Sequence, residues 1–136
     1  MNAEKLKECV GRVTNGTKLI VVSNREPCMH ELSSGVIQVF RPASGMVTAI
    51  EPLVRAVNGT WIAHGSGSAD REVVDGDSRI RLPEKKPEYV LRRIWLSRRE
   101  EDGYYYGLSN EALWPLCHIV YTRPQFSRTD WETYKA

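Results

Sequence analysis

The sequence predicts an α/β fold, with a mostly parallel sheet and flanking helices, and three stretches predict it. Lys18–Ser23 reads Lys-Leu-Ile-Val-Val-Ser, and its four consecutive aliphatic residues are typical of a strand buried on both faces. Residues 46–57 repeat apolar side chains at helical spacing, and residues 60–63 read as a second short buried strand. We therefore expect Leu19–Ser23 and Trp61–Ala63 at the centre of the sheet, with a helix packed on one face.

Turn formers and capping residues place the other elements. Ser44 is a good cap for a helix over residues 45–57, in which Pro52 should cause a kink or mark a second start. Ser97 can cap a short helix that Gly103 ends. In the first half of the chain we also expect a helix at 3–13, a polar loop at 26–34 and a short strand or hairpin arm at 35–40. In the second half we expect strands at 79–82 and 89–96, the Ser97-capped helix at 98–102, and a short helix at 111–114 capped by Ser109 or Asn110. A stretch of mostly β-forming residues at 116–121 and a last helix capped by Thr129 or Asp130 complete the expected elements.

Composition narrows the class of protein. The chain has 136 residues, of which 41% are apolar, and this suits one domain or a piece of one. There is no run of 18 apolar residues to span a membrane. Met1–Val13 is charged and alternating, unlike a signal peptide, so we expect a cytoplasmic protein. The balanced charge, +2 from 19 basic and 17 acidic residues, argues against nucleic-acid binding.

The cysteines give no sign of a metal site. Cys9, Cys28 and Cys117 are odd in number, and their spacing matches no zinc pattern. Cys28 and His30 lie two residues apart, but no second close ligand pair accompanies them. We expect reduced thiols, no metal and no cofactor.

Two stretches in the first half of the chain favour ligand binding. Arg25 follows the first strand, at the end where ligands bind in open α/β sheets, and its planar guanidinium suits a phosphate or carboxylate. The alternative is an ion pair with Glu26 or Glu31. Ser44-Gly45 opens a helix and offers backbone N–H groups to an anion. In contrast, Gly65 and Gly67 are only a weak dinucleotide-binding signal, because the third glycine and the long helix are missing.

An aromatic stretch marks the second half. Residues 104–116 read Tyr-Tyr-Tyr-Gly-Leu-Ser-Asn-Glu-Ala-Leu-Trp-Pro-Leu. Tyr and Trp combine an apolar face with a polar tip, which suits a wall against a sugar ring. A packed aromatic corner between a loop and a helix is the alternative.

Four ordered motifs resemble the N-terminal portion of the trehalose-6-phosphate synthases, a family of retaining, nucleotide-sugar-dependent glycosyltransferases. They are Leu19-Ile-Val-Val-Ser-Asn-Arg25, Ser44-Gly45-Met46 at the start of a helix, Tyr104 to His118, and Asp130-Trp131 with Tyr134. The resemblance implies a GT-B fold of two Rossmann-like domains. It implies that residues 18–136 are an incomplete N-terminal, acceptor-side domain, after an N-terminal extension at 1–17.

The resemblance also implies site roles. Arg25 would hold the phosphate of glucose 6-phosphate, and Tyr105 and Trp114 would line the same acceptor pocket. Ser44 and Gly45 would touch the pyrophosphate of the nucleotide-sugar donor, which the resemblance implies is UDP-glucose. One departure concerns the acceptor, since His64 stands where the family has a tryptophan; it could serve a related sugar or polyol phosphate, or be structural.

The resemblance leaves the catalytic residues outside this chain. A later His-Asp-Tyr-type segment and a C-terminal domain with a basic pair for the donor diphosphate would complete the cleft. We therefore expect residues 1–136 alone to be inactive, and to self-associate through the uncovered sheet edge and apolar face of a truncated domain. A non-catalytic sugar-phosphate-binding or regulatory module of the same ancestry is the alternative function.

Overall fold

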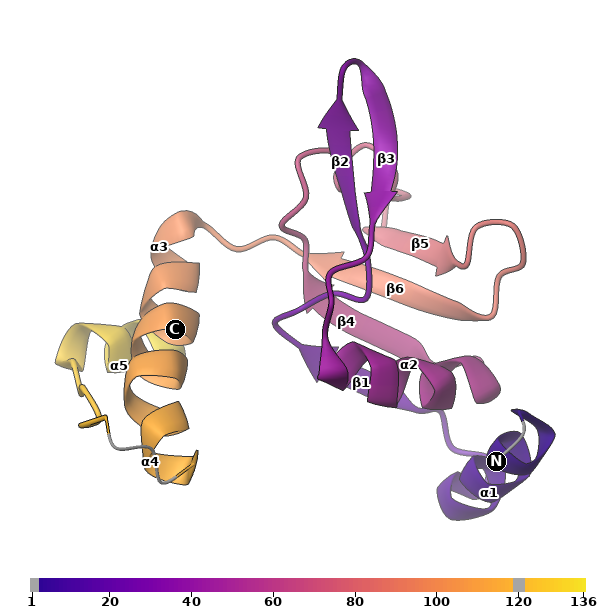
Figure 1. The fold of residues 1–136 in the computed structure, drawn as a ribbon, viewed down its shortest axis with the longest axis horizontal. Coiled ribbons are helices and arrows are strands. Elements are labelled where there is room, and N and C mark those ends of the chain that lie inside the picture. Colours follow the sequence, from indigo (N-terminus) through magenta and orange to yellow (C-terminus); the bar gives the residue numbers. More distant parts are fainter. Residues whose placement is uncertain (1–2, 119–121) are drawn as a thin grey trace. The chain divides into compact units, whose positions relative to one another are not determined.

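The computed structural model describes residues 3–118 and 122–136, which form two compact units, Met1–Trp95 and Leu96–Ala136. The first unit is built on a four-stranded sheet with the order β1 (Ile20–Ser23), β4 (Thr60–His64), β6 (Tyr89–Ile94) and β5 (Arg79–Leu82) (Figure 1). β1, β4 and β6 are parallel, and β5 pairs antiparallel with β6. This mixed, mostly parallel sheet with helices confirms the predicted α/β class.

Helix α2 (Gly45–Ala56) supplies the helical side of the core. The Ser44 side chain accepts a hydrogen bond from the Val47 N–H and caps the helix, as predicted. The helix continues through Pro52, so the predicted second start is wrong. Helix α1 (Ala3–Thr14) contacts α2. The buried core joins α2 to the strands and comprises Cys28, Val47, Val54, Trp61, Ala63, Leu82, Tyr89 and Leu91.

β1 lies at the edge of this sheet within the described part of the chain, so the prediction of a central strand at Leu19–Ser23 is wrong. Ile20 and Val22 are 58% and 72% exposed, whereas Val21 packs against the core. A run of aliphatic residues indicates side chains that are readily buried, but it does not indicate whether a strand has neighbours on both sides in the sheet. The described residues cover only one face of β1.

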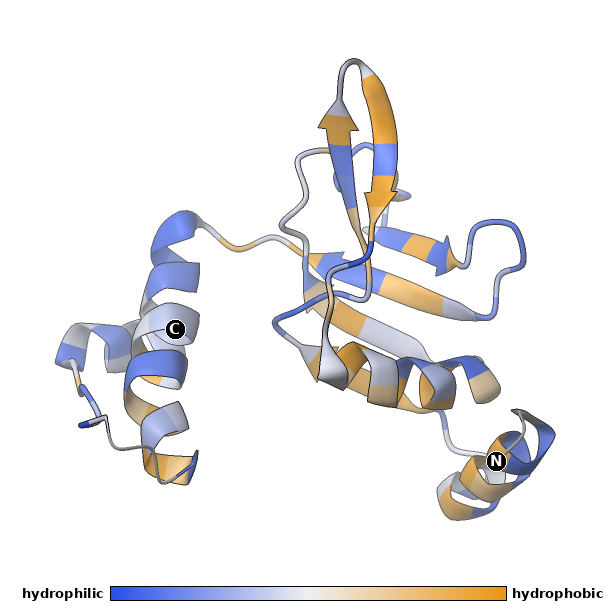
Figure 2. Ribbon diagram, in the orientation of Figure 1, coloured by the Kyte–Doolittle hydropathy of each residue, from blue (hydrophilic) through white to orange (hydrophobic). Residues whose placement is uncertain are grey.

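A hairpin follows β1 and stands away from the four-stranded sheet (Figure 1). It consists of β2 (Met29–Ser33) and β3 (Val36–Phe40), paired antiparallel. Ser34 and Gly35 both have positive φ, as a two-residue hairpin turn requires. The predicted hairpin arm at 35–40 is confirmed, whereas the predicted loop at 26–34 is wrong from Met29 onward. The hydropathy colouring shows apolar residues along β3 (Figure 2), although all of β3 is exposed.

The second unit is helical. α3 (Arg98–Glu100) continues into a π-helix, η1 (Glu101–Leu113), and then into α4 (Trp114–His118), while α5 (Arg128–Lys135) packs against η1. Ser97 caps α3 through a capping box with Glu100. Ser127, rather than Thr129 or Asp130, caps α5.

Three further predictions for this unit are wrong. The helix does not end at Gly103, and no separate helix begins at residue 111. A Cβ at Gly103 would lie 2.7 Å from the Cβ of Thr133, and one at Gly107 would lie 2.5 Å from the Cγ of Asp130. These glycines allow α5 to approach η1. Gly103 therefore serves close helix packing, and the prediction that it ends the helix is wrong. Residues 116–118 are helical, not strand-like, and residues 119–121 lie outside the described residues.

Candidate functional site

The carboxyl ends of β1, β4 and β6 meet at one edge of the sheet, because these three strands are parallel. Ser23 at the end of β1 lies opposite Ala63 on β4, which in turn lies opposite Arg93 on β6. The turn that contains Arg25 and the loop that begins after His64 therefore share this edge, which is where open α/β sheets bind ligands. The guanidinium-bearing residue, Arg25, is exposed there.

The turn at Arg25 is attached on its first side to the buried core. The indole Nε1–H of Trp61 donates to the Ser23 hydroxyl at 2.8 Å, and that hydroxyl donates to the backbone carbonyl of Arg25 at 2.7 Å. Trp61 is completely buried. A chain of two hydrogen bonds thus joins a fixed core side chain to the backbone of the candidate ligand residue.

Glu26 attaches the same turn on its other side. Its Oε2 accepts from the Nε–H of Arg93 at 2.7 Å, and its Oε1 accepts from the backbone N–H of Ser66 at 3.1 Å. Glu26 is 2% exposed and Arg93 is 1% exposed. The carboxylate therefore links the turn after β1 to β6 and to the loop after β4.

Arg93 lies at the centre of a buried polar cluster with Glu26, Asp70 and His30. Its Nη2 lies 2.7 Å from Asp70 Oδ1, and it also donates to the Cys28 carbonyl at 3.1 Å and to His30 Nδ1 at 2.9 Å. Because His30 Nδ1 accepts, the ring proton belongs on Nε2, which lies 3.3 Å from a carboxylate oxygen of Glu84. The Nη1 of Arg93 donates to the Asp70 carbonyl at 3.3 Å, so each of the three guanidinium nitrogens has an acceptor, as a buried charge requires.

The two carboxylates of the cluster differ in their pKa. Burial raises the pKa of Glu26 to about 7, and its hydrogen bond with Asp70 adds to the rise, against the lowering effects of the Ser66 N–H and Arg93. Burial alone would also raise the pKa of Asp70, but the bonds from Glu26 and from the His30 and Gly67 N–H groups lower it overall, with help from Arg93. Asp70 is therefore the ionised partner, and Glu26 is the one that titrates near neutral pH.

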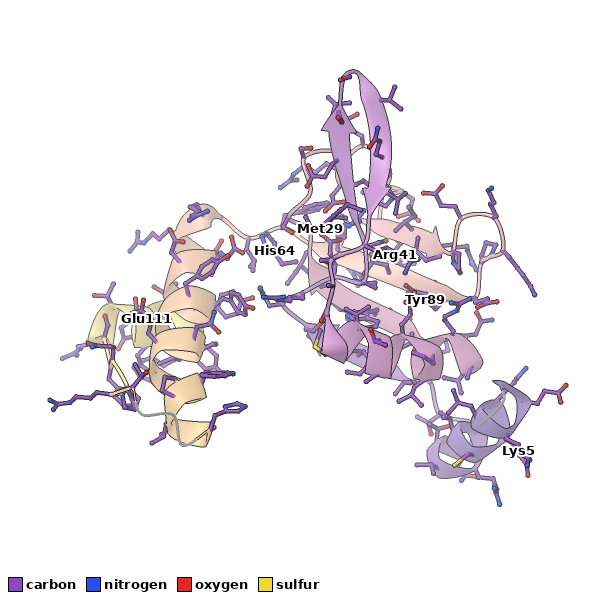
Figure 3. The ribbon with its side chains drawn as sticks, viewed as in Figure 1. Lys5, Met29, Arg41, His64, Tyr89 and Glu111 are labelled. Atoms are coloured by element: carbon purple, nitrogen blue, oxygen red, sulfur yellow. The ribbon has the colours of Figure 1, made fainter. Side chains whose placement is uncertain are left out.

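The glycines after β4 are explained by packing. A Cβ on Gly65 would lie 2.4 Å from the Trp95 ring, and one on Gly67 would lie 2.5 Å from the His30 carbonyl. Neighbouring groups therefore require glycine at both positions without any nucleotide. His64 ends β4 (Figure 3); its side chain is 8% exposed and its Nδ1–H donates to the Ile94 carbonyl at 3.3 Å.

Ser44 and Gly45 lie at the start of α2. The Ser44 hydroxyl caps the helix, with the Val47 N–H at 3.4 Å. No atom of the described residues lies within 4 Å of the position that a Cβ on Gly45 would take. Packing against this part of the chain thus does not require glycine there.

The aromatic stretch lies on the helix of the second unit, and Tyr105 and Trp114 define its aromatic face. The backbone N–H of Trp114 donates to the Ser109 carbonyl five residues earlier, the spacing of a π-helix. The buried residues of η1, which face α5, recur every four to five positions, at Gly103, Gly107, Leu108 and Ala112. With i→i+5 winding through η1, Tyr105 and Trp114, the first residue of α4, lie nine residues apart on the side of the helix away from those positions.

Stacking supports this face. The Trp114 ring is 50% exposed and stacks on His118 at 4.5 Å, and His118 Nδ1–H donates to the Trp114 carbonyl. Tyr105 contacts Tyr106 edge to face at 5.1 Å. The predicted grouping of Tyr105 and Trp114 with Arg25 spans the two units and stays a prediction.

The sequence interpretation missed Glu26, Asp70 and Arg93. Arg93 follows Leu91 by two residues on a strand whose alternate side chains are buried, which places it in the interior. That periodicity was the available signal. The acids proposed as alternative partners of Arg25 bond elsewhere as well, Glu26 to Arg93 and Glu31 to the Ser68 hydroxyl at 2.6 Å.

Within residues 3–118 and 122–136, no group of three or more His, Cys, Asp or Glu side chains could hold a metal ion. The three cysteines are free, and burial raises the pKa of Cys28 to about 11, so its thiol stays protonated. No helix in this part of the chain is long and apolar enough to cross a membrane.

Comparison with known proteins places this geometry in a family. A trehalose-6-phosphate synthase from Mycobacterium ulcerans is 37% identical over 124 residues, which are 90% of this chain and 24% of the relative. One from Mycobacterium tuberculosis is 32% identical over 132 residues, 93% of this chain and 25% of the relative. The chain thus spans about a quarter of the length of these relatives.

Solved structures agree. The E. coli structure described as trehalose-6-phosphate bound with UDP-2-fluoro glucose matches with a TM-score of 0.56 at 27% identity, over 88% of this chain and 22% of that one. A UDP-forming α,α-trehalose-phosphate synthase from Burkholderia vietnamiensis, at 24% identity and a TM-score of 0.55 over 87% of this chain and 21% of that one, shares the fold. The sequence profile of glycosyltransferase family 20 matches residues 17–136, and the chain therefore belongs to glycosyltransferase family 20.

Proposed function

We propose that the protein carrying this chain transfers glucose, with retention, from a nucleotide sugar to a sugar phosphate. UDP-glucose is the proposed donor, and glucose 6-phosphate, or a related sugar or polyol phosphate, is the proposed acceptor. The observation that carries the proposal is the Arg25 turn, an exposed guanidinium on a buried support at the carboxyl edge of a parallel sheet. The chain belongs to a family in which two of its relatives are trehalose-6-phosphate synthases.

The proposed roles divide between acceptor and donor. Arg25 binds the acceptor phosphate through a bidentate, charge-assisted contact. Tyr105 and Trp114 supply a hydroxyl and an apolar wall for the sugar ring. Ser44 and Gly45 approach the donor pyrophosphate with backbone N–H groups, which the open space at Gly45 permits. None of the residues in this chain is proposed as catalytic.

His64 is the residue with which we associate the identity of the acceptor. It lies at the same sheet edge as the Arg25 turn, and its ring is oriented by the Ile94 carbonyl. An imidazole can donate or accept a hydrogen bond, whereas a tryptophan would present mainly an apolar ring face. We therefore expect the acceptor panel to include sugar or polyol phosphates besides glucose 6-phosphate. The alternative of a purely structural His64 predicts glucose 6-phosphate alone.

The remaining partners follow from the length of the relatives. A C-terminal domain would hold most of the donor and the catalytic groups, so the chain of 136 residues alone is proposed to be inactive. We propose a cytoplasmic location, no nucleic-acid or membrane partner, and no metal or cofactor. Self-association through exposed β1 is also proposed, since Ile20 and Val22 leave an apolar strand at the edge of the described sheet.

A product assay tests the function. The full-length gene product that contains this sequence is incubated with UDP-, ADP- or GDP-glucose and with glucose 6-phosphate or other sugar and polyol phosphates, and products are identified by mass spectrometry. We expect a glucosylated sugar phosphate, with one acceptor preferred. Tight binding of a sugar phosphate without any transfer product would instead favour the regulatory module.

A further inference from the structure

The turn that carries Arg25 is held from both sides by buried side chains that the proposed function does not use. On one side, the carbonyl of Arg25 accepts the hydroxyl of Ser23, which is itself held by the Trp61 indole N–H. On the other side, Glu26 is bonded to Arg93 and to the Ser66 backbone. Arg25 is thus the exposed residue between two fixed neighbours.

Both attachments are stiff for a physical reason. Trp61 and Arg93 lie on β4 and β6, two interior strands of the described sheet, and both are 0–1% exposed. Arg93 is further fixed by Asp70 Oδ1 at 2.7 Å and by the Cys28 carbonyl at 3.1 Å. A rigid support matters because a guanidinium binds a phosphate bidentately only in a narrow range of positions.

We propose that Ser23 with Trp61, and Glu26 with Arg93, are positioning residues that set the Arg25 turn for a phosphate-bearing acceptor before the acceptor binds. This inference rests on the proposed function of Arg25 and deepens it. The four residues do not touch the acceptor. They favour binding because the turn is already ordered before the acceptor binds, so that less conformational entropy is lost on binding.

Two substitutions release the turn with little change in volume. Ser23→Ala removes the hydroxyl that bridges Trp61 to the Arg25 carbonyl, and Ser23→Thr keeps it. Glu26→Gln keeps the shape but offers one acceptor oxygen where the carboxylate offers two, so either Arg93 or Ser66 loses its partner. Asp70 still neutralises Arg93, which protects the fold of this variant.

A matched control exists in the same unit. The Ser78 hydroxyl accepts the Trp95 indole N–H at 3.1 Å, so Ser78→Ala removes a serine–tryptophan bond of the same chemistry that has no part in either attachment of the Arg25 turn. Arg25→Ala measures how much the Arg25 side chain itself contributes to acceptor affinity.

The experiment measures the Kd for glucose 6-phosphate by calorimetry at pH 8, and the melting temperature, for the full-length gene product and each variant. We expect Ser23→Ala and Glu26→Gln each to weaken binding about three- to tenfold, with Ser23→Thr near the wild type and Ser78→Ala unchanged in Kd. In an Arg25→Ala background, Ser23→Ala should change Kd no further, because it acts through Arg25.

The outcomes separate the two claims. If Arg25→Ala weakens binding while Ser23→Ala and Glu26→Gln lower only the melting temperature, the positioning role is wrong and the phosphate assignment stands. An equal loss of affinity from Ser23→Ala with and without Arg25 also overturns it. If the wild type does not bind glucose 6-phosphate, or Arg25→Ala binds it as the wild type does, the proposed function of Arg25 fails and this inference fails with it.

Discussion

The Arg25 turn and the aromatic face of η1 and α4 are placed by different physical means. The turn depends on side chains distant in sequence, since Ser23 bonds Trp61 and Glu26 bonds Arg93. The aromatic face depends on local winding, because i→i+5 bonding and the stack of Trp114 on His118 involve residues close in sequence. The first is a tertiary construction and the second is a property of one helix.

This difference decides where each region is sensitive to substitution. In the first unit, the buried Arg93 side chain bonds to several loops, so its loss should lower the free energy of unfolding and disturb loops that are distant in sequence. In the second unit, sensitivity should concentrate at the glycines where α5 contacts η1. Four substitutions test this contrast, from the largest expected effect to the smallest.

Arg93→Leu should be the most destabilising. It removes the buried cation and leaves the carboxylates of Glu26 and Asp70 without their charged partner. Breaking a buried ion pair in this way costs about 3–5 kcal/mol. Chemical denaturation measures it, with Arg92→Leu, an exposed neighbour on the same strand, as the control expected to change stability by less than about 0.5 kcal/mol. Equal effects of the two substitutions would contradict the cluster's role.

Gly103→Ala should destabilise the second unit by about 1–3 kcal/mol, because its Cβ would lie 2.7 Å from that of Thr133 on α5. The same substitution at Gly11 in α1, where nothing lies within 4 Å, should stabilise by about 0.5–1 kcal/mol through helix propensity. Thermal unfolding of both variants checks the opposite signs. A stabilising Gly103→Ala would show that this glycine is not needed for the contact with α5.

Glu26→Gln should change how stability depends on pH. Burial raises the pKa of Glu26 to about 7, above its ordinary value of 4.5, so its contribution to stability is complete below about pH 4.5 and is lost as pH rises through 7. Glutamine cannot ionise and lacks this loss. The variant should therefore gain on the wild type, by about 1–3 kcal/mol, between pH 5 and pH 8. Urea unfolding at several pH values measures it, and a constant difference would mean that Glu26 does not titrate in this range.

Ser97→Ala should have the smallest effect, a loss of about 1 kcal/mol. It removes the side chain that accepts the Glu100 N–H at 3.2 Å at the start of α3. Because the contact is local and exposed, the first unit should unfold unchanged. Hydrogen exchange resolved by residue would show the loss confined to residues near 97–102, and a loss of protection in the sheet would contradict the separation of the two units.

The sequence anticipated what depends on local pattern. Helix α2 and its Ser44 cap, strands at β4, β5 and β6, and the arm of the hairpin at β3 all follow from periodicity and capping. The family was anticipated from ordered motifs, and residues 17–136 match it. These features depend on residues that are close in sequence, so periodicity, capping and motif order are enough to predict them.

What failed depends on partners elsewhere in the chain. β1 lies at an edge because pairing is a property of the sheet, not of the aliphatic run. Gly103 does not end the helix. It is a glycine because Thr133, thirty residues later on α5, packs where a Cβ on residue 103 would lie. The buried cluster joins residues 26, 30, 70 and 93, a set that no local pattern connects. For the candidate site, the sequence thus indicated Arg25 but not the side chains that hold it.

The most direct test of the account is the effect of Arg25→Ala on the acceptor in the full-length gene product. Loss of charge-assisted hydrogen bonds should raise the acceptor KM by about ten- to a hundredfold, while the donor KM and the melting temperature change little. Arg25→Lys should recover only part of the loss, because an ammonium lacks the planar fork. An unchanged acceptor KM together with a lowered melting temperature would show that Arg25 is a structural residue and would contradict the account.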